Sequence, residues 1–77
     1  MANEQIFFRL NGVSTLIGRE FVQLEWDGVR VGIDRDVWDG IGGSCYERVM
    51  GIHQQVIERG LSGDLTVSAK GGQCPNL

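Results

Sequence analysis

The chain has few of the residues on which several common classes of protein depend. It contains one proline, one lysine and one histidine among its 77 residues, and two cysteines, Cys45 and Cys74. Two cysteines are too few for a disulfide scaffold. C-x-x-C and H-E-x-x-H motifs are missing, and so is a serine in a nucleophile elbow. We therefore expect no enzymatic activity, no metal and no cofactor.

Long apolar runs and clustered positive charge are also missing. No apolar run approaches the roughly 18 residues of a membrane span, and the start, MANEQIFF, lacks the basic and apolar regions of a signal peptide. The net charge is −3, whereas proteins that bind phosphate backbones usually carry a clustered basic face. We expect a cytoplasmic protein without a membrane partner, and we do not expect nucleic acid as a partner.

The composition that is present is that of one small globular domain. Apolar residues make up 42% of the chain and charged residues 22%, which argues against disorder. A domain of this size buries roughly 60% of its unfolded surface, so its stability is marginal and a partner would add to it. We predict a single α+β domain over residues 1–70 and a flexible tail over residues 71–77.

The clearest structural signal is a β-hairpin within residues 21–33. Asp27-Gly28 separates two runs of strand-forming residues and favours a type I′ turn, because both positions of that turn need a positive φ. This turn fixes the register. Three apolar pairs then lie on one face: Trp26 with Val29, Leu24 with Val31, and Val22 with Ile33. Glu25 lies opposite Arg30 on the other face.

Two further turns extend this hairpin toward the N-terminus. Asn11-Gly12 repeats the type I′ signal and pairs Leu10 with Val13, Phe8 with Thr15 and Ile6 with Ile17. Gly18-Arg19 predicts a type II′ turn, which pairs Leu16 with Phe21 and Thr15 with Val22. A bulge at Gly18 in a longer strand is the alternative. Residues 5–34 then form a four-stranded antiparallel meander with one apolar face.

The downstream half supplies a cover for that face. Ser44 and Glu47 form a capping box, which starts a helix that runs to about Arg59 and stops at Gly60. Asp34 or Asp36 caps a short helical turn before it. Alternating residues 64–69 predict a fifth strand at a sheet edge. The predicted architecture is ββββαβ: a four-stranded antiparallel meander, one main α-helix and a short C-terminal edge strand.

The other face of the meander is the first candidate site. The predicted pairings place Phe7, Leu16 and Phe21 in one row, and exposed apolar patches mark interaction sites. Three charged residues share this face: Arg9, Glu25 and Arg30. Alternatively, the tail or a loop covers the row. Aromatic residues on a sheet can also stack bases, but two arginines are weak support for that interpretation.

The second candidate site is the glycine-rich loop that leads into the main helix. Free amides at a helix N-terminus can hold an anion, which suggests a nucleotide or phosphate site at Gly42, Gly43 and Ser44. Trp38 and Tyr46 would form its walls. The loop lacks the lysine of a P-loop, and three nearby aspartates, Asp34, Asp36 and Asp39, would repel a phosphate. The same aspartates lack the ligand pattern of a calcium loop.

Cys45 and His53 are the remaining groups with reactive side chains. Cys45 is in the first helical turn, a position that lowers the pKa of a thiol, but it also falls on the stripe predicted to face the core. His53 follows eight residues later, about 12 Å along the helix, and is too far away to act as its base. Cys45, His53 and Cys74 do not have zinc spacing. We expect a structural cysteine and a histidine at the edge of the core.

Three functional hypotheses follow. The first is a non-enzymatic protein-binding module, such as a small regulator or inhibitor of the type encoded by phages and other mobile elements. The second is a binder of small molecules or anions at residues 40–44. The third is a structural homodimer that joins through the sheet edge or the helix.

Overall fold

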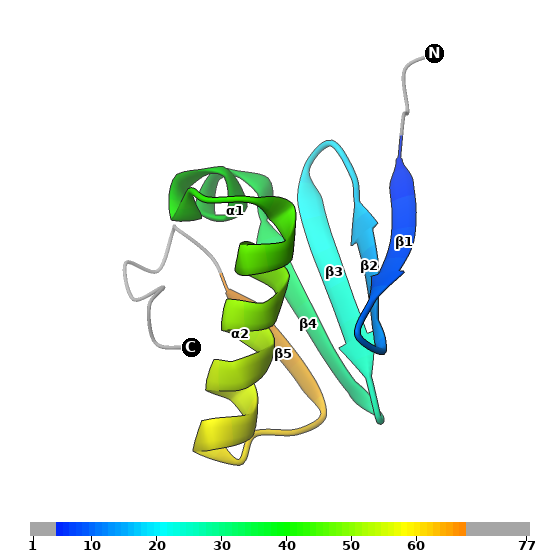
Figure 1. The fold of residues 1–77 in the computed structure, drawn as a ribbon, viewed down its shortest axis with the longest axis vertical. Coiled ribbons are helices and arrows are strands. Elements are labelled where there is room, and N and C mark those ends of the chain that lie inside the picture. Colours follow the sequence, from blue (N-terminus) through cyan, green and yellow to red (C-terminus); the bar gives the residue numbers. More distant parts are fainter. Residues whose placement is uncertain (1–4, 68–77) are drawn as a thin grey trace.

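The computed structural model describes residues 5–67, which form one five-stranded sheet with two helices on one side of it (Figure 1). The strands lie in the sheet in sequence order. Along the chain the elements are β1 (Ile6–Leu10), β2 (Val13–Ile17), β3 (Phe21–Trp26), β4 (Val29–Asp34), α1 (Arg35–Ile41), α2 (Cys45–Arg59) and β5 (Asp64–Val67). This order confirms the predicted ββββαβ architecture.

The fifth strand differs in direction from the first four. β1 to β4 are antiparallel neighbours, whereas β5 pairs with β4 in parallel, because the two helices between them return the chain to the same end of the sheet. The predicted short helical turn is the seven-residue helix α1. Residues 68 and 69 of the predicted fifth strand, and the predicted tail 71–77, lie outside the described residues.

Both Asx-Gly turns have the predicted geometry. Asn11 and Gly12 have φ values of 47° and 83°, and Asp27 and Gly28 have φ values of 43° and 81°. Positive φ at both central residues is the requirement of a type I′ turn. The registers that these turns impose on β1–β2 and on β3–β4 are therefore the predicted ones, residue for residue.

The turn between β2 and β3 corrects the prediction. Ile17 pairs with Val22 and Thr15 with Leu24, so the predicted pairs Leu16–Phe21 and Thr15–Val22 are wrong by two positions along β3. Gly18 does not have the positive φ of a type II′ turn, and its N–H donates to the carbonyl of Phe21. A shift of two residues keeps every side chain on its predicted face.

The core lies between the helices and one face of the sheet, the inner face. Val22, Leu24 and Val31 on the sheet are fully buried, and so is Val49 on α2. The other members of the core cluster are Val13, Trp26, Val29, Ile33, Trp38, Ile52, Val56 and Val67. Neither helix of the described residues is long and apolar enough to cross a membrane.

The two ends of α2 confirm the predicted start and stop signals. The hydroxyl of Ser44 accepts the amide of Glu47, and the Glu47 carboxylate accepts the amide of Ser44. At the other end Gly60 is left-handed, with φ 66°, and its N–H donates to helix carbonyls. Not every apolar side chain of α2 is buried, because Tyr46 is 51% exposed and Ile57 is 57% exposed.

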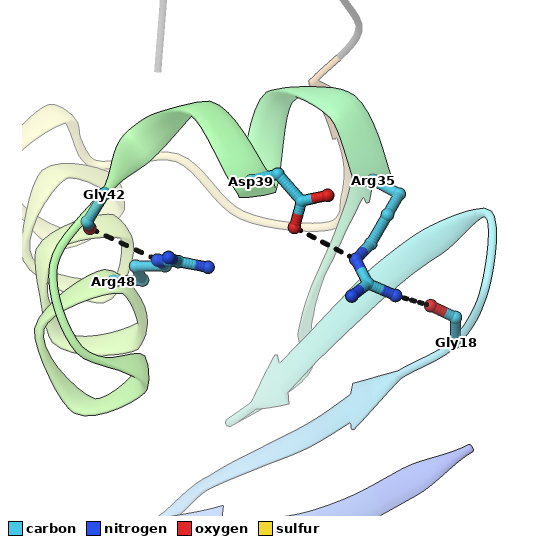
Figure 2. Close-up of polar contacts among 5 residues, drawn as sticks. All are labelled: Gly18, Arg35, Asp39, Gly42 and Arg48. Atoms are coloured by element: carbon cyan, nitrogen blue, oxygen red, sulfur yellow. Dashed lines mark hydrogen bonds and ion pairs between the residues drawn. The ribbon is translucent and has the colours of Figure 1, made fainter. Parts of the chain in front are cut away.

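Hydrogen bonds from two arginines connect α1 to the neighbouring elements (Figure 2). Arg35 Nη1 donates to the carbonyl of Gly18 at 2.6 Å, its Nε donates to Asp39 at 3.2 Å, and its backbone N–H donates to Glu20. Arg48 on α2 donates to the carbonyl of Gly42 at 3.2 Å. The first residue of α1 therefore holds the loop between β2 and β3.

The cover over the inner face does not extend to the whole of β1. Ile6 points to the inner face and yet is 57% exposed, and Phe8 is half-buried without joining the core cluster. Only Leu10, at the far end of this strand, packs against the core. The edge strand β1 thus carries exposed apolar side chains.

Candidate functional site on the outer face of the sheet

The face of the sheet turned away from the helices, the outer face, has its apolar side chains on the first three strands. Phe7 is 65% exposed and lies directly opposite Leu16, as predicted. Across the sheet the same row continues with Gln23, Gly32 and Thr66. Because these three positions offer polar groups or no side chain, this row is apolar only on β1 and β2.

Phe21 is not in the predicted row. The shifted β2–β3 register places Gln23 opposite Leu16. Phe21 therefore lies two residues before that position, at the start of β3 and opposite Asp34. It is 49% exposed. Leu16 and Phe21 nevertheless line the same hollow, which has a volume of about 310 Å³.

The hollow, called the outer-face hollow below, is lined by both apolar and polar residues. Its lining residues are Gln5, Leu16, Gly18, Arg19, Glu20 and Phe21. Arg19 and Glu20, which are exposed, supply one charge of each sign beside the side chains of Leu16 and Phe21. Since Arg35 binds Gly18 and Glu20 from α1, one wall of the hollow is fixed by the helix layer.

The three predicted charged residues of this face lie in a separate row. Arg9, Ser14, Glu25, Arg30 and Asp64 follow one another across the five strands. Arg30 and Glu25 form an ion pair at 3.8 Å, and Arg9 Nε lies 3.5 Å from Ser14 Oγ. The paired side chains are about half exposed, so this ion pair adds about 0–1 kcal/mol to stability. The row is a polar border of the apolar surface.

The amides at the end of the glycine-rich loop and the start of α2 are already hydrogen-bonded to other groups of the chain. The amide of Ser44 donates to the Glu47 carboxylate, and the amide of Glu47 donates to the Ser44 hydroxyl. The left-handed Gly43 (φ 83°) brings the chain so close to Glu47 that a Cβ there would lie 2.6 Å from the carboxylate oxygen. An anion at Gly42, Gly43 and Ser44 would therefore have to displace a carboxylate that is already bound.

The two predicted walls of that site have different surroundings. Trp38 is 2% exposed and belongs to the core, with the Arg48 guanidinium 5.3 Å from its ring centre. Tyr46 is exposed, and its hydroxyl accepts a hydrogen bond from Asn11. The structure does not bring Trp38 and Tyr46 together as two accessible walls of one pocket.

Cys45 and His53 lie at the border of the core. Cys45 is half-buried and packs against the core cluster. His53 is half-buried, and its ring meets Trp26 edge to face at 4.6 Å between centres. Cys74 lies outside the described residues. Among residues 5–67, no three His, Cys, Asp or Glu side chains gather as metal ligands would.

Four residues that line the outer-face hollow were not predicted as site residues from the sequence: Gln5, Gly18, Arg19 and Glu20. The glycine was visible as a turn signal, but the hollow depends on the turn being centred one residue later. That position is set by hydrogen bonds from Arg35, 17 residues away in the chain from Gly18. A local pattern does not contain this information.

Comparisons with known proteins add no relative to this picture. No protein-family model matches the chain, and no curated protein or solved structure matches it significantly. Function is therefore inferred from the geometry of the chain itself.

Proposed function

We propose that this chain is a protein-binding domain whose outer-face hollow receives an apolar side chain of another protein. The observation that carries the proposal is a hollow of about 310 Å³, lined in part by Leu16 and Phe21, with the exposed Phe7 opposite Leu16 on β1. No other described element covers this face of the sheet. Phe7 and Phe21 expose 65% and 49% of their surfaces to solvent.

The shape and chemistry of the surface support a protein as the partner. Hot spots in protein interfaces are apolar anchors that fill pockets and are ringed by less important polar contacts. Leu16 and Phe21 would contact such an anchor, and Arg19 and Glu20 would lie at its rim. A volume of about 310 Å³ is at the small end of binding pockets, which suits one bulky side chain.

The charge distribution favours a protein over a nucleic acid. Arg30 is paired with Glu25 and Arg9 lies beside Ser14, so neither arginine is an isolated contact for a phosphate. The net charge of −3 would also repel a phosphate backbone. A regulator or inhibitor that occupies a surface of its target is the role that fits this domain best.

The test is an affinity capture from host extract with quantitative mass spectrometry, which compares two double variants. Phe7→Ser/Phe21→Ser removes both exposed rings of the outer face. Ile41→Ser/Ile57→Ser is the matched control, because these side chains are also 46% and 57% exposed but lie on the helices. Thermal unfolding of both variants checks that the fold is kept.

We expect the first variant to lose a partner that the wild type and the control retain. Loss of anchor residues at a hot spot costs more than about 1 kcal/mol each, so recovery of the partner should fall at least tenfold. Equal recovery with the folded Phe7→Ser/Phe21→Ser variant would show that the outer face does not bind this partner and would contradict the proposal.

A further inference from the structure

The free edge of β1 presents unpaired backbone groups. Leu10 and Val13 flank a two-residue turn and are therefore a hydrogen-bonded pair, as are Phe8 and Ile6 with their partners on β2. The N–H and C=O groups of the intervening residues, Gln5, Phe7 and Arg9, then point away from β2. No described strand pairs with this side of β1.

This edge has few of the features that protect sheet edges in other proteins. Edges are usually blunted by proline, by charged side chains such as lysine, by a bulge, or by shortness of the strand. β1 has five residues without proline or lysine, Arg9 is its one charged residue, and its pairing with β2 is continuous. Its exposed side chains include Ile6 and Phe7, at 57% and 65%. At the opposite edge, β5 spans four described residues and begins with the charged Asp64.

We propose that β1 pairs antiparallel with β1 of a second copy of this chain, with Phe7 opposite Phe7 of the second copy. This register places Gln5 opposite Arg9 of the second copy and makes all three outward-pointing residues hydrogen-bonded pairs, with about six backbone hydrogen bonds. The arginines face neutral glutamines and not each other. A shift by two residues would place Phe7 opposite Arg9 and lose one of the three pairs.

The register also covers the apolar side chains that the helices leave exposed. On the inner face, Ile6 of each copy lies opposite Phe8 of the other, which extends the apolar face past the limit of the helix layer. On the outer face, the two Phe7 rings become neighbours and can stack or meet edge to face. Of the residues that line the outer-face hollow, Leu16 and Phe21 lie on β2 and β3 and stay accessible, whereas Gln5, next to β1, and the neighbouring Phe7 contact the second copy. The dimer is thus additional to the proposed function.

The test measures the oligomeric state of the full chain by sedimentation equilibrium, with two matched variants. Ile6→Lys puts a charge beside Phe8 of the second copy, and Ile57→Lys puts the same charge on α2, at a side chain of equal exposure, 57%. We expect wild type and Ile57→Lys to approach 17 kDa, twice the chain mass of 8.5 kDa, at micromolar concentration. We expect Ile6→Lys to raise the dimer Kd at least tenfold, because two cross-strand pairs are lost.

A second pair of variants tests the register. Gln5→Glu would face Arg9 with an opposite charge and should lower the dimer Kd several-fold at low salt, whereas Gln5→Arg should raise it by a similar factor. Amide exchange gives an independent reading. The amides of Phe7 and Arg9 should gain protection with increasing protein concentration, while those of Phe8 and Leu10, bonded to β2, should be protected at every concentration.

Three results would overturn the proposal. The first is a wild-type chain that stays monomeric up to about 1 mM, which would leave the edge to a strand of another protein. The second is a dimer that Ile6→Lys and Ile57→Lys affect equally. The third is a dimer in which the Phe7 amide exchanges at the same rate at all concentrations, because the interface would then lie elsewhere.

Discussion

Replacing Arg35 by alanine should destabilise the domain by more than its exposed ion pair suggests. The side chain donates to the carbonyl of Gly18, a buried residue, at 2.6 Å and to Asp39 at 3.2 Å. Its backbone bond to Glu20 would survive the substitution. The variant therefore removes one bond to a partly buried carbonyl and one exposed ion pair.

The two lost contacts have different expected costs. An unsatisfied buried carbonyl costs about 1–3 kcal/mol, and we take about 1–2 kcal/mol here because Arg35 is 38% exposed and water can replace part of the bond. The ion pair with Asp39, which is 57% exposed, contributes about 0–1 kcal/mol. In a domain of this size each kcal/mol lowers the Tm by about 4–8 °C.

Thermal unfolding of Arg35→Ala, Asp39→Ala and the double variant separates the two contacts. We expect Arg35→Ala to lower the Tm by about 4–24 °C and Asp39→Ala by at most about 8 °C. Arg35→Ala should also weaken binding at the outer-face hollow, since it releases the loop that forms one wall. Equal small losses for both single variants would refute the assignment of Arg35 as the anchor of the β2–β3 turn.

Three further predictions concern the start and the middle of α2. Ser44→Ala removes the hydroxyl that accepts the Glu47 amide and should cost about 1 kcal/mol in urea unfolding, whereas Ser62→Ala, in an exposed turn, should change little. An equal effect of both would contradict the capping box. Gly51→Ala should stabilise the domain by up to about 1 kcal/mol, because no atom lies within 4 Å of the added Cβ and alanine favours a helix. Gly43→Ala should do the opposite, by about 1–2 kcal/mol, because of its φ of 83° and the close carboxylate of Glu47; a stabilised Gly43→Ala would show that the loop is not held in this conformation.

The parts of the fold that the sequence predicted are those that a few adjacent residues determine. Asn11-Gly12 and Asp27-Gly28 have the residue types that type I′ turns favour and adopt positive φ at both positions, so two registers followed from four residues. The capping box at Ser44 and the left-handed stop at Gly60 are equally local. With these fixed, the alternation of apolar residues placed the inner face correctly.

The parts that could not be predicted depend on residues distant in the chain. Arg35 donates a hydrogen bond to the carbonyl of Gly18 in the turn after β2. With the turn in this position Gln23 and not Phe21 lies opposite Leu16, so Phe21 is not in the row of Phe7 and Leu16. The exposure of Ile6 depends on how far the helix layer extends over the sheet, which no spacing in the sequence states. For the candidate site, the sequence therefore placed Phe7, Leu16 and Phe21 on the outer face, but it predicted neither the hollow nor that Leu16 and Phe21 line it.

The order of elements along the chain has a consequence for biosynthesis. The hairpins of residues 6–34 close through local contacts, which form in microseconds. The side chains that shield them, those of Trp38, Val49, Ile52 and Val56, are all translated later. A nascent chain that stopped before residue 35 would expose a bare apolar β-sheet together with the open edge of its first strand, and such a fragment would aggregate instead of folding.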